Sequence, residues 1–430
     1  KSAQLPNSFF SREPISAGIL LGAFAALAAR TLKLPPFDRT EYYFPAPPEF
    51  IRLFMRGGIS CSGLAPARVR NGAFLTLGMP TPFDHYVCEK FRKYNRDTRD
   101  THAGVIRSLT DDFSDRCTTR DGKHVCGGKH DRISKTWIEL EPDRYGFEPD
   151  RREEVHIRMQ PELGRVEEGV LFEYIALEAN QFYAGELVFK SEDDWQSFQQ
   201  LTGLQSDQKQ EIHLGKAVQR GYGKTTLYLQ KVEEKETPSA LFPWKITDRI
   251  TLSHAKEKGL HLMLLTDAII PDSWGRFYRS IDKDWVAGLL GLEPKHIERL
   301  VVDGQHRDLH GFHGQRRMPR WRDIVVSVGS CAGIRISQQG WQKLEQLALE
   351  EEETDADPAA EVNQAGEATP GYRWLCARLA KIENEGIGLR RHEGFGRIVF
   401  NHPLFDTSDS NKTRLSWKLP SELNAEHDKN

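Results

Sequence analysis

A short stretch near the middle of the chain, GKAVQRGYGKT from Gly215 to Thr225, combines glycine with basic and aromatic side chains. A Walker A phosphate loop reads G-x-x-x-x-G-K-[ST], and Gly223 and Lys224 supply the last part of that motif. Val218 occupies the position where the motif requires its first glycine. The pattern therefore argues against a nucleoside-triphosphate loop, and the stretch needs another explanation.

The same pattern occurs a second time, in GLRRHEGFGRIVF from Gly388 to Phe400. Both copies read G-x5-G-aromatic-G-basic, and both run into a segment typical of a β-strand, 225–229 and 398–400. The matched pairs are Gly215 with Gly388, Gly221 with Gly394, Tyr222 with Phe395, Gly223 with Gly396, and Lys224 with Arg397. This repeat predicts two related domains, with two unrelated glycine-rich turns as the alternative.

Loops of this composition suit RNA. Glycines allow a close backbone approach, successive amides bind anions, basic side chains hold phosphates, and aromatic rings stack on bases. The candidate RNA-binding residues are Gly215, Lys216, Arg220, Gly221, Tyr222, Gly223 and Lys224 in the first loop, and Arg390, Arg391, Gly394, Phe395, Gly396 and Arg397 in the second. The alternatives are solvated basic side chains, rings packed beneath their own loops, and a phosphometabolite-binding protein that uses only the glycines and amides.

Length and charge leave room for more than one domain. The chain has 430 residues and a net charge of −3, so contact with nucleic acid depends on local basic patches. Its 6 cysteines are irregularly spaced, which is unlike a secreted disulfide framework. The apolar segment 15–30 is too short to span a bilayer, and we expect a buried helix there rather than a signal peptide.

The predicted elements follow the order β-α-β-β-α-β of a ferredoxin-like unit. In the first domain, 1–235, they are a helix at 16–30, an irregular insertion at about 35–150, extended segments at 155–159 and 170–189, a helix at 191–203, the first glycine loop and a strand at 225–232. The first strand of the unit is expected before residue 1. Ser191 is expected to cap the helix at 191–203, and Gly203 to end it.

A second domain of the same kind is predicted over 240–405. Its predicted elements are a strand at 261–270, a helix at 282–292, an extended segment at 323–336, helices at 338–352 and 372–382, and the second glycine loop. An acidic disordered insertion is expected at about 345–370, and a polar tail over 406–430. The predicted fold class is α+β, with tandem ferredoxin-like domains.

The segment VHIRMQPELGRVEEGVLFEYIALEANQFYAGELVF, at 155–189, resembles the RAMP superfamily of CRISPR-associated proteins. The residues that match the family pattern are Arg158, Gly169, Leu171, Phe172 and Phe182. Asn180 stands where a glycine is usual. GIGLRRHEGFGRIVF resembles the distal glycine-rich segment of the Cas-five-like (Csx-ten) branch of type III-D effectors, and FFSREPISAGILLGAFAA is loosely similar to its proximal segment.

This resemblance implies a tandem RRM-like RAMP protein that acts as an RNA-binding scaffold, with Arg158 among its RNA contacts. Such a subunit of a type III (III-D-like) effector ribonucleoprotein caps the repeat-derived 5′ handle of a CRISPR RNA. It contacts the large signature subunit and backbone RAMP subunits, and meets target RNA only indirectly. The implied setting is RNA-guided antiviral defence in the cytoplasm, with no membrane partner.

Catalysis is the main alternative, because related RAMP proteins include metal-independent endoribonucleases in which a histidine moves protons. The histidines that could serve are His254, His261 and His392. Backbone RAMP proteins instead use a loop aspartate, for which Asp111, Asp112 and Asp115 are available. The scaffold interpretation assigns no catalytic residue.

Two further features remain open. CTTRDGKHVCGGKH brings Cys117, His124, Cys126 and His130 together, and Cys and His ligands suit a structural zinc ion. The spacing is not that of a standard zinc knuckle, Cys61 or Cys88 could join, and free thiols are the alternative. The basic and aromatic stretch 305–335 suits single-stranded RNA or, equally, a protein surface.

Overall fold

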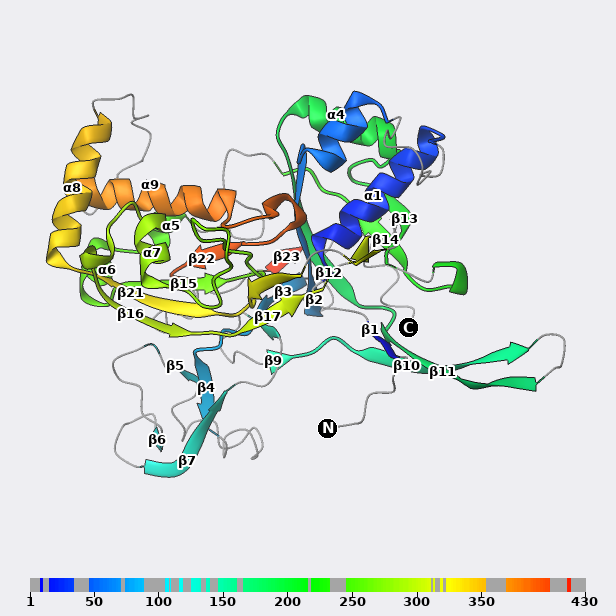
Figure 1. Cartoon of the computed structure of the whole chain (residues 1–430), viewed down its shortest axis with the longest axis horizontal. Helices are drawn as coiled ribbons and strands as arrows, with labels where there is room; N and C mark the ends of the chain where they lie inside the picture. Colours follow the sequence, from blue (N-terminus) through cyan, green and yellow to red (C-terminus); the bar gives the residue numbers. More distant parts are fainter. Residues whose placement is uncertain are drawn as a thin grey trace.

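The protein is a mixed α+β chain with several antiparallel sheets (Figure 1). The structure is a computed structural model that describes residues 8–10, 15–34, 46–70, 74–88, 105–107, 109, 116–118, 125–132, 137–139, 146–160, 165–215, 218–232, 245–310, 312–313, 318–319, 322–352, 369–402 and 416–418. None of the helices in these ranges is long and apolar enough to cross a membrane.

The helices and helical turns are short apart from α1, α4, α8 and α9. Their bounds are α1 (Ala17–Thr31), α2 (Pro48–Phe50), η1 (Ile51–Met55), α4 (Glu192–Thr202), η3 (Val218–Arg220), α5 (Ile246–Arg249), α6 (Leu252–Glu257), α7 (Lys283–Leu289), η4 (Pro294–His296), α8 (Gln338–Glu352), α9 (Pro370–Glu385) and η5 (Arg391–Glu393).

The strands pair mostly over long distances in the sequence. The strands of the N-terminal half are β1 (Ser8–Phe10), β2 (Ile59–Arg70), β3 (Phe74–Pro80), β4 (His85–Cys88), β5 (Val105–Arg107), β6 (Arg116–Thr118), β7 (Val125–Arg132), β8 (Trp137–Glu139), β9 (Gly146–Phe147), β10 (Arg151–Gln160), β11 (Arg165–Leu177), β12 (Phe182–Phe189), β13 (Lys209–His213) and β14 (Lys224–Tyr228). The remaining strands are β15 (Leu260–Leu264), β16 (Ile297–Asp303), β17 (His306–Leu309), β18 (Phe312–His313), β19 (Met318–Pro319), β20 (Asp323–Val326), β21 (Cys331–Ile336), β22 (Ile398–Phe400) and β23 (Ser416–Lys418).

The C-terminal half is built on a sheet with the order β16-β21-β15-β22. Every neighbouring pair is antiparallel, so β15 and β16 run parallel with β21 between them. Helix α7 connects β15 to β16, and α8 and α9 connect β21 to β22. This is the split β-α-β arrangement of a ferredoxin-like unit. The sequence did not predict β16, and the segment expected to be extended at 323–336 forms two strands, β20 and β21, that pair in different sheets.

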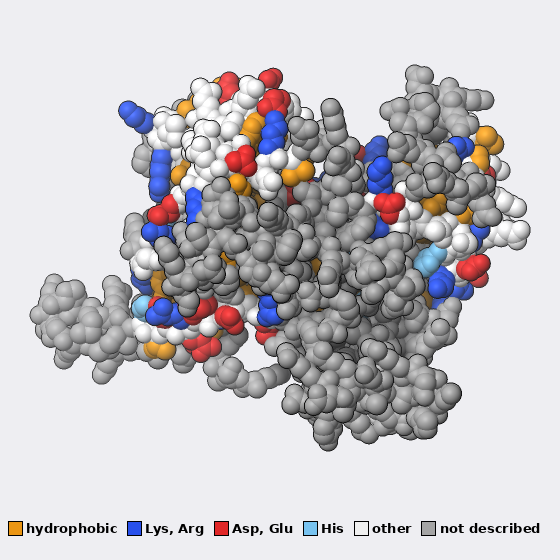
Figure 2. All heavy atoms as spheres, turned by 180° about the vertical axis from the view of Figure 1, so that it is seen from behind, with side chains coloured by type: hydrophobic (Ala, Val, Ile, Leu, Met, Phe, Trp, Pro, Cys, Tyr) orange, Lys and Arg blue, Asp and Glu red, His pale blue; other side chains and the backbone are white. Residues whose placement is uncertain are grey.

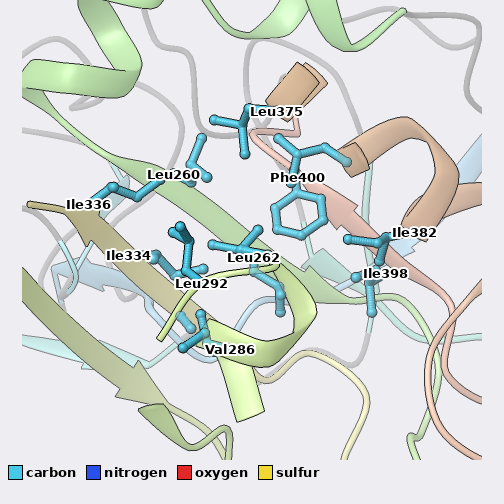
Figure 3. Close-up of a cluster of buried hydrophobic side chains, with 14 of the residues drawn as sticks. Leu260, Leu262, Val286, Leu292, Ile334, Ile336, Leu375, Ile382, Ile398 and Phe400 are labelled. Carbon is cyan, nitrogen blue, oxygen red and sulfur yellow. The ribbon is translucent and has the colours of Figure 1, made fainter. Parts of the chain in front are cut away.

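The two faces of this sheet are covered differently, because side chains alternate along a strand. Leu260, Leu262 and Leu264 of β15 pack with side chains of α7, α8 and α9, as Figure 3 shows around Val286 and Leu375. The intervening residues His261 and Met263 are also buried, so the opposite face is covered as well. Burying each such leucine contributes about 1.5–3 kcal/mol to folding.

The N-terminal half has a helical pair as its core. The rings of Phe24 on α1 and Phe198 on α4 meet edge to face, with their centroids 5.2 Å apart. The Ser191 hydroxyl accepts a hydrogen bond from the Asp194 amide and caps α4, which ends at Gly203 with a φ of 74°. The predictions for the two helices and for the cap are confirmed.

The strands of the N-terminal half do not form the single ferredoxin-like sheet that the sequence predicts. They are divided among a β1-β11-β10 sheet, a sheet containing β12-β2-β3 and the β13-β14 hairpin. The prediction of one extended element at 170–189 is wrong, because β11 ends at Leu177 and β12 pairs with β2 in another sheet. Asn180 bends the chain between them with a φ of 60°. The side-chain amide of Gln181 donates to the carbonyl oxygens of Asp150 and Glu178.

The expectation of an irregular insertion at 35–150 is also wrong for its described residues. A π-helix, η1, leads into the β2–β3 hairpin, and β2 pairs with β12 far along the chain. Further strands form a sheet with the order β5-β4-β7-β6. Glycine and proline obscured the alternation of these strands in the sequence, and their partners lie too far away to be read from a local pattern.

Two elements lie where none was expected, and one prediction is confirmed. Strand β1 precedes α1 and runs parallel to β11, while the strand expected before residue 1 stays a prediction. The helix predicted at 338–352 is confirmed as α8, and the acidic residues 353–368 lie outside the described part of the structure. The C-terminal tail contributes β23, which pairs with β3.

Candidate nucleic-acid interface

Each glycine loop leads into a β-strand, but the elements before the two loops differ. The first joins β13 to β14 and contains the turn η3, and the second joins α9 to β22 and contains the turn η5. In the first loop the Leu214 amide donates to the Gly223 carbonyl at 2.8 Å. In the second loop the Ile387 amide donates to the Gly396 carbonyl at the same distance, 2.8 Å. The same hydrogen bond therefore closes both loops.

The matched glycines share their backbone conformation, with φ in the left-handed region that favours glycine. The φ values are 85° at Gly215 and 72° at Gly388, 85° at Gly221 and 83° at Gly394, and 77° at Gly223 and 74° at Gly396. A Cβ atom on Gly223 would overlap the carbonyl oxygen of Leu214, and one on Gly396 would overlap that of Ile387. The sequence repeat is therefore also a repeat of backbone conformation at the matched glycines.

The first loop packs on the β10–β11 hairpin through a group that we call the tyrosine cluster: Glu154, His156, Tyr174, Arg220 and Tyr222. The Tyr222 ring stacks on Tyr174 with centroids 5.4 Å apart, and the Tyr222 hydroxyl lies 3.1 Å from His156 Nε2. The Arg220 guanidinium donates to the Tyr174 hydroxyl at 2.7 Å. The loop therefore holds its aromatic and basic side chains in a defined arrangement.

One carboxylate sets the electrostatics of the tyrosine cluster. The Tyr222 hydroxyl donates a hydrogen bond to Glu154, which lowers the pKa of that carboxyl. The same bond raises the pKa of Tyr222. Glu154 is thus negatively charged at neutral pH and also pairs with Arg152 Nε at 2.8 Å. A phosphate directly over Glu154 is disfavoured, whereas an uncharged base against the tyrosine rings is not.

The remaining candidates of this region differ in exposure. Lys224 at the start of β14 is 67% exposed and pairs with Glu211 at 3.0 Å. Arg158 lies in β10 where the pairing shifts register between Ile157 and Met159, and its side chain is outside the described part of the structure. Lys216 also lies outside the described residues.

The second loop packs between the two halves of the chain. A Cβ atom on Gly394 would lie 2.7 Å from the carbonyl oxygen of Cys61 on β2 and 2.9 Å from the Ala17 Cβ on α1. Arg397 donates to Glu186 of β12 at 2.9 Å. The glycine at this position therefore permits the contact between the halves.

The basic side chains of the second loop have different surroundings. Arg390 is 25% exposed, pairs with Glu393 and Asp323, and lies 4.7 Å from the centre of the Phe395 ring. Arg397 is 21% exposed and is held by Glu186. Arg391 is 49% exposed, and its guanidinium donates to the carbonyl oxygen of Glu385 at the end of α9. Arg391 is therefore better placed than Arg390 or Arg397 to meet a ligand.

The histidines considered for catalysis are not brought together. His254 lies in α6, His261 is buried in β15, and His392 is 44% exposed in the second loop beside Gly57. Asp111, Asp112 and Asp115 lie outside the described ranges.

The sequence-predicted zinc ligands are only partly visible. His130 lies opposite Cys88 in the β4–β7 pairing. His124 and the side chains of Cys117 and Cys126 are not among the described residues. The prediction of a zinc ion there remains a prediction.

In the basic stretch 305–335, two of the described arginines have acidic partners. Arg307 pairs with Asp267, and Arg322 pairs with Asp308. Basic and acidic side chains are likewise intermixed over the described residues on the face shown in Figure 2. The described residues therefore assign no strongly basic surface to this stretch.

The sequence missed Tyr174, Glu154 and His156. They lie in β10 and β11, and Tyr174 is separated from Tyr222 by the whole of β12 and α4. An aromatic residue in a strand is ordinarily a core residue, so nothing local marked Tyr174 as a neighbour of the loop.

Comparisons with known proteins found no matching family model and no matching curated protein. Among solved structures, the chain is similar to one in a cryo-EM structure of the type III-B Cmr-beta complex bound to cognate target RNA, at 9% identity and a TM-score of 0.36. That match covers 84% of this chain and 83% of the other. A second match, to the complex bound to cognate target RNA and AMPPnP, has 11% identity, a TM-score of 0.33 and covers 79% and 82% of the two chains. The chain thus has structural similarity to subunits of a type III-B Cmr CRISPR effector, at low sequence identity.

Proposed function

We propose that this chain is a CRISPR RNA-binding subunit of a type III, III-D-like effector ribonucleoprotein. In this role it caps the repeat-derived 5′ handle and contacts the large signature subunit and the backbone RAMP subunits. It acts as a scaffold in RNA-guided antiviral defence, and its contact with target RNA is indirect. The split β-α-β sheet of the C-terminal half is its second RAMP-like domain, and the N-terminal half is a divergent first one.

The pair of glycine loops is the observation that carries this proposal. The loops share their φ values and their closing hydrogen bond, and each follows a pattern that resembles the glycine-rich segments of RAMP proteins. Two matched turns with basic and aromatic side chains are expected of a protein that follows a nucleic-acid backbone with related domains.

The surroundings of the side chains divide the candidates by role. Arg220, Lys224 and Arg391 are exposed and contact phosphates. Tyr222 and Tyr174 offer a stacked pair of rings against which a base can pack, and the nearby Glu154 carboxylate keeps phosphate away. Arg390 and Arg397 are largely buried in ion pairs that hold the second loop in position. They affect RNA binding indirectly, by keeping the loop in its folded conformation.

The experiment that tests this function is purification of the tagged full-length chain from cells that express it with its own operon. The RNA that co-purifies is sequenced, and the accompanying proteins are identified. The proposal predicts CRISPR RNAs that share one repeat-derived 5′ end, together with other effector subunits.

Other outcomes contradict the proposal in distinguishable ways. Absence of RNA, or RNA without a common 5′ end, removes the capping role. RNA that is cut only when His254, His261 or His392 is intact assigns the chain to the metal-independent endoribonucleases instead.

A further inference from the structure

A buried polar cluster lies on the face of the C-terminal sheet that is opposite to helices α7, α8 and α9. His261 of β15 and Cys331 of β21 point to this face, because their neighbours Leu262 and Ala332 belong to the core on the helical side. The turn between β3 and β4 covers them, and its Phe83 amide donates to the Gly329 carbonyl at 2.8 Å. In Figure 1, β4 correspondingly lies next to the sheet that contains β15 and β21.

This turn places Asp84 directly against the sheet. An Asp84 carboxylate oxygen, Oδ2, lies 3.0 Å from His261 Nε2. One ligand atom each of Asp84, His261 and Cys331 can be chosen so that all three lie within 4.8 Å of one another. The other carboxylate oxygen, Oδ1, lies 2.8 Å from Nδ1 of the adjacent His85.

The cluster is closed off from solvent. Asp84, His85 and Cys331 are 0% exposed, and His261 is 6% exposed. Met263, Val399 and Leu109 pack around Cys331, whose thiol donates to the Gly329 carbonyl oxygen at 3.2 Å. A carboxylate in such a place is costly unless a positive charge compensates it.

The three donors are those of a transition-metal site. A carboxylate oxygen, an imidazole nitrogen and a thiolate are ligands that zinc takes in tetrahedral sites. A divalent ion bound by Asp84 and the Cys331 thiolate would leave the buried site without net charge, with His261 neutral. His85 would orient the Asp84 carboxylate from its other side, as outer-shell groups do in metal sites. Three protein ligands leave one position of a tetrahedral ion for a water molecule.

We infer that Asp84, His261 and Cys331 form a buried site for one transition-metal ion of the zinc class. The ion joins the β3–β4 turn of the N-terminal half to β15 and β21 of the C-terminal sheet. This site is separate from the zinc prediction for Cys117, His124, Cys126 and His130, and it does not depend on the RNA-binding role.

The site is tested with the purified full-length chain, by zinc analysis and by titration of the metal-free protein with Co²⁺. Cobalt bound to a thiolate gives an intense near-ultraviolet charge-transfer band, which reports directly on a Cys–metal bond. We expect this band in the wild type and its loss in Cys331→Ser, together with the loss of about one zinc ion per chain relative to the wild type. His85→Ala is expected to retain the band and weaken cobalt binding by about 10- to 100-fold.

Cys376→Ser is the matched control, since Cys376 is also buried but lies in α9, away from Asp84 and His261. It should retain the band and the zinc content of the wild type. The inference is overturned if the wild type shows no thiolate-to-cobalt band. It is equally overturned if Cys331→Ser and Cys376→Ser bind metal alike, because the cluster is then a hydrogen-bonded His-Asp-His group or the metal is bound elsewhere. If Cys331→Ser fails to fold, the Cys117→Ser/Cys126→Ser variant decides: it is expected to keep the band, and loss of the band in that variant overturns the inference.

Discussion

The guanidinium of Arg397, in the second glycine loop, donates a hydrogen bond to the carboxylate of Glu186 at 2.9 Å. The two residues belong to different halves of the chain, since Arg397 precedes β22 and Glu186 lies in β12. Their side chains are 21% and 13% exposed, so the pair is largely shielded from water. The second loop therefore fastens the two halves together as well as carrying basic residues.

Breaking this shielded ion pair is expected to cost more stability than breaking an ion pair on the surface. Arg397→Ala is expected to lower the free energy of unfolding by about 2 kcal/mol, because it leaves the shielded Glu186 carboxylate without its donor. Lys231→Ala breaks the exposed Lys231–Glu192 pair, and its expected cost is about 0–1 kcal/mol. Urea unfolding of the two variants checks this, and equal costs would contradict the fastening role.

The close approach of Gly223 to Leu214 predicts a strict requirement for glycine. Gly223→Ala places a Cβ against the Leu214 carbonyl oxygen and strains a backbone with a φ of 77°, so the loop must deform. Gly221→Ala has a similar φ of 85° but open space around its Cβ, so its expected cost is the backbone strain alone, about 1–2 kcal/mol. Thermal unfolding should show the Gly223 variant as clearly the less stable. The same stability for both would mean that the carbonyl contact is unimportant.

The bend at Asn180 predicts which residues can replace it. Its φ of 60° is readily adopted by glycine. Asn180→Gly is expected to preserve the free energy of unfolding, whereas Asn180→Val should lower it by about 1–2 kcal/mol. Ala179→Val, one residue earlier on an exposed part of the bend, should change it by less than about 0.5 kcal/mol. A harmless Asn180→Val would show that the left-handed bend is not formed.

Buried thiols predict a loss of stability at alkaline pH. Burial raises the pKa of Cys61 and of Cys376 from 9.0 to about 11. A raised pKa in the folded state gives stability that is complete below pH 9.0 and falls as pH rises towards about 11. Cys376→Ala should therefore lose less stability across this range than the wild type, by up to about 1.4 kcal/mol for each pH unit. If the free energies of unfolding of Cys376→Ala and the wild type, measured in urea, differ by the same amount at every pH, the raised pKa of Cys376 is contradicted.

The sequence predicted what depends on local pattern. Periodic apolar residues located α1, α4 and α9, and the spacing of Ser191 and Gly203 located both ends of α4. The glycine repeat was visible because three matched positions need a left-handed φ that few other residues adopt. In the C-terminal sheet the sequence located β15, β21 and β22, but it did not predict the edge strand β16.

The sequence did not predict what depends on distant pairing. The partner of β12 is β2, more than a hundred residues earlier, and no local pattern in either strand identifies the other. The Tyr174–Tyr222 stack and the Arg397–Glu186 pair are likewise contacts between separate elements. For this reason the sequence predicted the same RNA-binding role for Arg397 and Lys224. In the structure the Arg397 side chain is 21% exposed and the Lys224 side chain 67% exposed, so only Lys224 is open to a ligand.

The central claim, that the glycine loops hold CRISPR RNA, is tested most directly by RNA-binding measurements over a series of salt concentrations. The probe is a fluorescent RNA that carries the repeat-derived 5′ handle. The Lys224→Ala/Arg391→Ala double variant is compared with a Lys231→Ala/Lys381→Ala control, whose lysines are 56% and 63% exposed and lie outside the loops. We predict weaker binding for the loop variant alone, with a salt slope reduced by about 1.4 for two lost phosphate contacts. Equal affinity and equal salt slope for the two double variants would contradict the claim.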